Sequence, residues 1–150
     1  MPCGRRDVIV SAGGQGCAMH PTLAAAIKVE LSEFVTAAGT RRDLHTSCHV
    51  GHPGGERSTF EHLEIDDAAL RTDLVERAID GLLTTEGACA WVTRSGELGL
   101  VDADAEWFAA ARAAFARHGL PLPAFFVLNR RGWVDLVSGE TREWYRIRNR

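Results

Sequence analysis

ACAWVTRSGELGLV (residues 88–101) and AFFVLNRRGWVDLV (residues 124–137) are two apolar stretches, each interrupted near its middle by a short polar segment that contains glycine. Apolar runs on both sides of a glycine-bearing turn are typical of β-hairpins. We therefore expect two hairpins, with their turns at Ser95–Gly96 and Arg131–Gly132.

Helical periodicity precedes each of these hairpins and also an earlier pair of strand-like segments. Pro21 suits the first turn of a helix, Asp66 or Asp67 can cap the start of the second, and Gly119 is a natural stop for the third. Apolar residues recur at spacings of three and four within each segment. The predicted helices cover residues 21–38, 67–83 and 102–118.

The remaining strand-like segments complete the expected order. A short strand at residues 7–11 opens the chain, and strands at residues 43–50 and 59–65 follow the first helix. An initial strand followed by three helix–hairpin (αββ) units predicts an α+β fold, a mostly antiparallel sheet with three helices on one face. No linker divides the chain, so we expect a single domain over residues 1–150, with residues 1–18 as a loosely ordered N-terminal segment.

The composition excludes several classes of protein. With 45% hydrophobic and 25% charged residues, the 150-residue chain has the balance of an ordinary globular domain. No apolar run is long enough for a membrane span or a signal peptide, so we expect no membrane association and a cytoplasmic location. The four cysteines show no CxxC pair, which favours reduced thiols. One lysine among 17 basic residues, with abundant alanine, indicates a GC-rich bacterial genome.

Charge is unevenly distributed along the sequence. Residues 61–108 carry twelve acidic residues and three arginines, whereas residues 109–150 carry eight arginines and three acidic residues. Opposite fields of this kind steer partners or promote self-association, or neutralise each other within one domain.

Three histidines and a cysteine fall within DLHTSCHVGHPGGE, residues 43–56. Alternation along a strand predicts that Cys48 faces the core and that His45 and His49 face outward. The two imidazoles would then lie roughly 13 Å apart, at about 3.3 Å per residue, too far to share one metal ion.

A different set of histidines suits a metal ion better. His49 ends the predicted strand, His52 lies in the glycine-rich turn, and His62 lies on the same predicted face of the next strand. Three imidazoles that leave one coordination position open are the ligands of a catalytic zinc. The sequence therefore predicts a candidate zinc site at His49, His52 and His62, with Glu64 as a further ligand or the general base.

Other interpretations of these residues remain open. Cys17 and His20 together with Cys48 and His52 have spacings that a structural zinc tolerates. The His-x-Glu segment at 62–64 lacks the Pro-Cys-x-x-Cys partner of the zinc deaminases, and there is no HExxH motif. A polar strand face that has simply collected histidines explains the same pattern.

No catalytic motif is established, so the function favoured by the sequence is a small accessory or regulatory domain that acts by binding. A protein partner or a second copy of the chain is favoured over nucleic acid, with the acidic second helix or the basic C-terminal region as the contact surface. The alternative is a metal-dependent hydrolase that uses the candidate zinc site. The predicted partner-binding residues are Trp133, Trp144, Arg130, Arg131, Arg146, Arg148 and Arg150.

Overall fold

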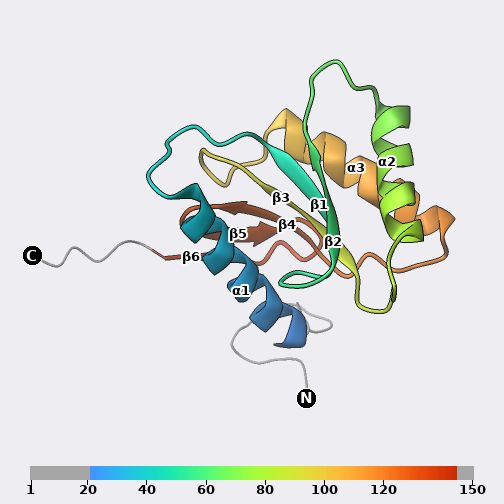
Figure 1. Cartoon of the computed structure of the whole chain (residues 1–150), viewed down its shortest axis with the longest axis horizontal. Helices are drawn as coiled ribbons and strands as arrows, with labels where there is room; N and C mark the ends of the chain where they lie inside the picture. Colours follow the sequence, from blue (N-terminus) through green and yellow to red (C-terminus); the bar gives the residue numbers. More distant parts are fainter. Residues whose placement is uncertain (1–20, 145–150) are drawn as a thin grey trace, which may run out of the picture.

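The computed structural model describes residues 21–144, which form one six-stranded sheet and three helices (Figure 1). The strand order is β2-β1-β3-β4-β5-β6, and every neighbouring pair is antiparallel except β3 and β4. The predicted α+β class, with a mostly antiparallel sheet and three helices, is confirmed for this part of the chain. The elements are α1 (Pro21–Ala38), β1 (Ser47–Gly51), β2 (Arg57–Glu61), α2 (Ala68–Asp80), β3 (Cys89–Thr93), α3 (Asp102–Arg117), β4 (Phe125–Asn129), β5 (Gly132–Asp135) and β6 (Thr141–Glu143).

The expected series of three αββ units is not confirmed. A single strand, β3, follows α2, and the chain then passes through α3 to β4, which lies parallel to β3. The segment expected to be the second strand of that hairpin instead wraps around Arg94, whose guanidinium donates to the carbonyl oxygens of Ser95, Glu97 and Gly99. The strand expected at residues 7–11 lies outside the described residues.

The first and last predicted hairpins are present, with shifted boundaries. β1 and β2 pair with Ser47 opposite Glu61, so the second strand ends four residues before its predicted end at Ile65. Gly51 has a φ of 144°, and a Cβ atom there would lie 2.3 Å from the Glu56 carbonyl oxygen, so the turn requires glycine. In the last hairpin Asn129 pairs with Gly132, which places the turn at the two intervening arginines.

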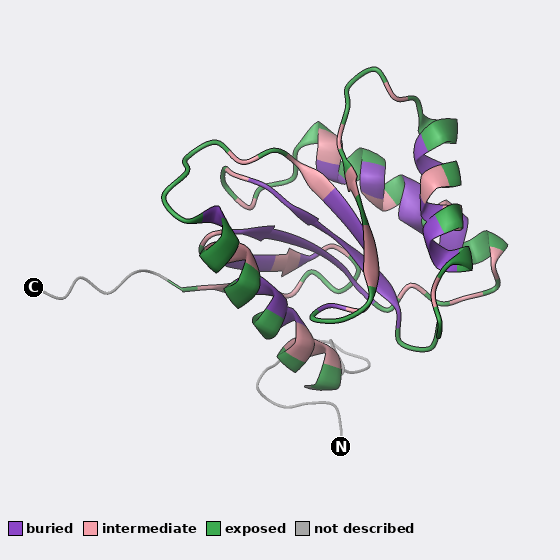
Figure 2. Cartoon of the chain, viewed as in Figure 1, coloured by how far each residue is buried: buried purple, intermediate pink, exposed green. Residues whose placement is uncertain are grey.

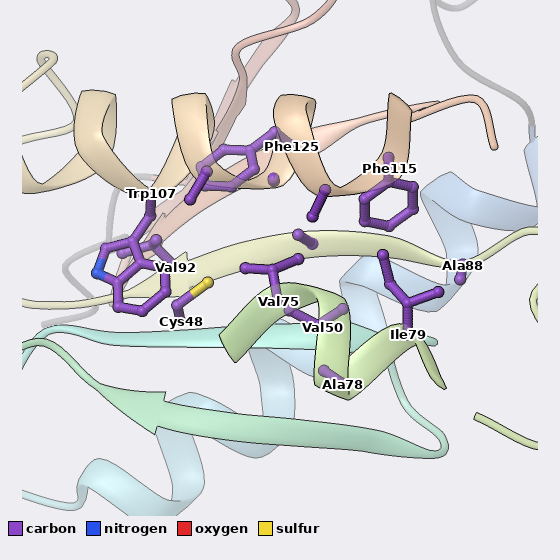
Figure 3. Close-up of a cluster of buried hydrophobic side chains, with 14 of the residues drawn as sticks. Cys48, Val50, Val75, Ala78, Ile79, Ala88, Val92, Trp107, Phe115 and Phe125 are labelled. Carbon is purple, nitrogen blue, oxygen red and sulfur yellow. The ribbon is translucent and has the colours of Figure 1, made fainter. Parts of the chain in front are cut away.

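Both faces of the sheet are covered, whereas the sequence predicted cover on one face. All five residues of β3 and all five of β4 are buried, because their alternating side chains enter two different cores (Figure 2). The core beneath α2 and α3 is shown in Figure 3. It includes Cys48, Val50, Val75, Val92, Trp107, Phe115 and Phe125.

The second core lies beneath α1 on the other face. Ile27 and Leu31 of α1 pack with Trp91, Phe126 and other buried residues. An ion pair between Glu30 of α1 and Arg57 of β2 joins the helix to the edge of the sheet. No helix in the stretch from residue 21 to residue 144 is both long and apolar enough to cross a membrane.

Candidate functional site

His49 lies inside the domain, between the sheet and α1. It is 9% exposed and stacks on Trp91 with ring centroids 5.4 Å apart. Its Nδ1 lies 2.8 Å from Thr59 Oγ1 and its Nε2 lies 2.9 Å from Thr93 Oγ1. Burial lowers the pKa of His49 to about 4, so the imidazole is neutral near pH 7. Both ring nitrogens therefore make hydrogen bonds that link β1 to its two neighbours, β2 and β3.

His62 lies on the opposite side of the sheet from His49. The β1–β2 register places Thr59 beside His49, whereas the next residue, Phe60, packs with Trp107 in the core under α3. Trp107 Nε1 donates a hydrogen bond of 3.0 Å to His62 Nδ1. Because an indole N–H only donates, a neutral His62 carries its proton on Nε2. The sheet separates the two imidazoles that the predicted zinc site requires to be close together.

The other predicted zinc ligands are also apart. His52 Nε2 donates to the Thr84 carbonyl oxygen at 2.9 Å, and Glu64 is exposed in the turn before α2. Cys48 is fully buried, which confirms it as a core thiol, and burial raises its pKa well above the usual range for cysteine. Within residues 21–144, no group of three or more His, Cys, Asp or Glu side chains is arranged to hold a metal ion. Cys17 and His20 lie outside the described residues.

The two predicted tryptophan contacts differ in accessibility. Trp133 is 4% exposed and packs edge-to-face against Phe126 beneath α1, so it does not contribute to the surface. Trp144 is 41% exposed, and its backbone N–H donates to the Arg131 carbonyl oxygen at 2.7 Å. That bond places Trp144 beside the turn between β4 and β5. The predicted contacts at Arg146, Arg148 and Arg150 lie outside the described residues.

Arg130 connects the β4–β5 turn to the end of α1. Its guanidinium donates to the carbonyl oxygens of Gly39, at 2.7 Å, and Arg41. Arg41 in turn donates to the carbonyl oxygens of Ala37 and Ala38 in the last turn of the helix. Carbonyl groups at a helix C-terminus lack intrahelical partners and favour cations, so these two arginines also have a structural role.

A pocket of about 180 Å³ opens beside this junction, at the carboxyl ends of β3 and β4. Three arginines line it, Arg42, Arg130 and Arg131, together with residues 95–97 and Asn129. We call it the arginine pocket. The side chains of Arg42 and Arg131 make no hydrogen bond or ion pair with any residue that the structure describes.

Hydrogen bonds between three loops hold the walls of the arginine pocket in place. Asn129 Oδ1 accepts from the backbone N–H groups of Arg131 and Gly132, while its Nδ2 donates to the Gly96 carbonyl oxygen. Ser95 Oγ donates to the Arg42 carbonyl oxygen and accepts from the Leu44 N–H. These hydrogen bonds hold the backbone on both sides of Arg131 and at Arg42 in place.

The sequence pointed to Arg130 and Arg131 but not to Arg42, Ser95 or Asn129. Recognising those residues requires knowing that β3 and β4 are parallel, because parallel strands bring the residues that follow them to one edge of the sheet.

Comparisons with protein-family models, with curated proteins and with solved structures give no match for this chain. The candidate site therefore rests on the side chains themselves. His49, His52 and His62 each have separate hydrogen-bond partners, whereas Arg42 and Arg131 line one pocket and their guanidinium groups have no partner in the part of the chain that the structure describes. The arginine pocket is the candidate site.

Proposed function

We propose that this chain is a small accessory or regulatory domain that binds an acidic segment of a partner protein at the arginine pocket. The observation that carries the proposal is a pair of guanidinium groups, those of Arg42 and Arg131, that have no partner within residues 21–144 and lie beside the anchored Arg130. Arginine presents a planar fork of donors that matches a carboxylate in a bidentate geometry. A pocket with two such forks suits a ligand that supplies negatively charged oxygens.

Trp144 extends the proposed contact surface. Its backbone N–H donates a hydrogen bond to the Arg131 carbonyl oxygen, and its side chain is partly exposed at the end of β6. Binding energy in protein interfaces is concentrated in a few aromatic and arginine residues. We assign Trp144 the role of apolar contact next to the charged groups, and we drop Trp133 from that role because it is buried.

A protein partner is favoured over a nucleic acid because of the charge on the rest of the domain. Twelve acidic residues lie between residues 61 and 108, and the whole chain has a net charge of −3. A long polyanion would be repelled by that surface, whereas a short acidic segment needs to reach only the arginine pocket. Metal-dependent hydrolysis, the alternative from the sequence, is not proposed, because the structure does not bring His49, His52 and His62 together.

A peptide-binding titration tests the proposal. The probes are a fluorescent peptide rich in Asp and Glu, a basic peptide of equal length and a single-stranded oligonucleotide. The test variant is Arg42→Glu/Arg131→Glu. The control is Arg77→Glu/Arg112→Glu, which makes the same change of charge at exposed positions on α2 and α3.

We expect the acidic peptide to bind the wild-type chain. Its affinity should fall at least tenfold in the pocket variant and should change less than threefold in the control variant. Equal losses in both variants would mean that only net charge matters and would contradict the proposal. Stronger binding of the oligonucleotide than of the acidic peptide would reject a protein partner in favour of nucleic acid.

A further inference from the structure

The charge of the arginine pocket indicates which anion it recognises. Its lining carries three arginines and one carboxylate, Glu97, which gives a formal charge of +2. A phosphate monoester carries about −1.5 to −2 at pH 7, whereas an Asp or Glu side chain carries −1. The charge of the pocket therefore matches a phosphate group more closely than a carboxylate.

The number of guanidinium groups available to a ligand also favours a phosphate. One guanidinium fork can occupy both oxygens of a carboxylate. Arg42 and Arg131 provide two forks that have no partner among the described residues, and Arg130 adds a third positive charge. A phosphate monoester has three terminal oxygens and can accept from both unpaired guanidinium groups at once.

The size of the pocket limits what the phosphate is attached to. A volume of about 180 Å³ is small beside the roughly 300–1,000 Å³ of pockets that enclose whole small molecules. A pocket of this size suits a phosphate and the end of the side chain that carries it better than a whole nucleotide.

We infer that the arginine pocket binds the phosphate group of a phosphorylated serine or threonine in the acidic partner segment. This inference rests on the proposed function and adds the chemical group that is recognised. Clusters of arginine are a recurring means of reading phosphorylated motifs. The fixed positions of Asn129 and Ser95 keep the loops that carry these arginines in a single arrangement.

The test compares two acidic peptides that differ at one position, phosphoserine in one and glutamate in the other. Both are titrated against the full chain, against Arg42→Gln/Arg131→Gln and against the control Arg77→Gln/Arg112→Gln, with circular dichroism to verify folding. We expect the phosphopeptide to bind wild type and the control at least tenfold more tightly than the glutamate peptide. The pocket variant should lose this preference. The phosphopeptide should also bind more tightly at pH 7 than at pH 5, because the second phosphate pKa is about 6.

The outcomes separate this inference from the proposed function. If both peptides bind equally and both depend on Arg42 and Arg131, the proposed function stands and the phosphate inference is overturned. If neither peptide is affected by the pocket substitutions, both are overturned. Inorganic phosphate is a third probe: if it displaces the phosphopeptide at concentrations close to those of the peptide itself, the pocket is a free-phosphate site and recognition of a phosphorylated segment is overturned.

Discussion

Arg94 and Asp104 form a buried, bidentate ion pair, with Arg94 Nε 2.9 Å from Asp104 Oδ1 and Nη2 2.8 Å from Oδ2. The remaining N–H groups of Arg94 donate to carbonyl oxygens of the loop between β3 and α3. Residues 95–97 of that loop form one wall of the arginine pocket. The ion pair therefore fixes the shape of the proposed binding site from inside the domain.

Replacing Asp104 by alanine leaves Arg94 charged, buried and without its carboxylate partner. Breaking a buried ion pair on one side costs about 3–5 kcal/mol of stability. We expect Asp104→Ala to reduce the free energy of unfolding by that amount, measured by urea denaturation. The double variant Arg94→Met/Asp104→Leu removes the unpaired charge but also the donors to the carbonyl oxygens of Ser95, Glu97 and Gly99, so it should recover only part of the loss. A decrease below about 1 kcal/mol in the single variant would show that the pair does not support the loop.

The buried His49 should make the domain less stable in mild acid. Its pKa is lowered by burial from 6.5 to about 4, so the unfolded chain binds a proton at a pH where the folded chain does not. Its contribution to stability is complete above pH 6.5 and is lost as the pH falls from there to 4. The expected loss is about 3 kcal/mol, measured from urea midpoints across this range.

His49→Leu should flatten this pH dependence, although it also leaves the hydroxyl groups of Thr59 and Thr93 without a partner. His45→Gln is the control, because His45 is exposed. An unchanged slope in His49→Leu would assign the pH dependence to other groups.

His118 should have the opposite effect on the pH dependence of stability. Its Nε2 lies 2.8 Å from Asp80 Oδ1, and this hydrogen bond, followed by the one to the Ala114 carbonyl, raises the pKa of His118. The stabilisation is present below the ordinary pKa of about 6.5 and is lost as the pH rises through the raised value. Asp80→Asn should weaken this dependence, as measured by thermal unfolding between pH 6 and pH 9, because the bond to the Ala114 carbonyl remains. If the wild type shows no such dependence, the contact between α2 and α3 does not depend on charge.

Substitutions of Trp133 and Trp144 should have different effects, the first on stability and the second on peptide binding. Trp133→Ala removes a large buried side chain and should cost about 3–5 kcal/mol of unfolding free energy. Trp144→Ala should change stability little but weaken the binding of the acidic peptide, because the Trp144 side chain is partly exposed beside Arg131. The comparison requires one urea titration and one peptide titration for each variant. Normal peptide binding by Trp144→Ala would remove this residue from the contact surface.

Local signals in the sequence predicted the helices well. Asp67 caps α2 by accepting from the Leu70 N–H at 2.8 Å, and Gly119 follows α3 with a φ of 68°. Period-two alternation also placed Cys48 in the core. These features depend on residues that are close in the sequence, which is why they could be read from it.

The errors concern contacts between distant residues. His49 was expected on the surface because it lies on the face of its strand opposite Cys48. Alternation assigns a residue to a face, but it does not show whether a helix covers that face. The segment 98–101 is apolar enough for a strand, but Arg94 donates to the carbonyl oxygens of Glu97 and Gly99, and Leu100 remains exposed. The arginine pocket needs a parallel pairing of β3 and β4 that no local pattern indicates.

NMR of the ¹⁵N-labelled full chain locates the binding site of the acidic peptide directly, through the backbone amides and the Nε–H groups of the arginines. If the arginine pocket is the binding site, the largest chemical-shift changes will fall on Arg42, residues 95–97 and residues 129–131, and on the side chains of Arg42 and Arg131. Chemical-shift changes concentrated on α2 or on β2, with the pocket signals unchanged, would show that the acidic peptide does not bind at the arginine pocket.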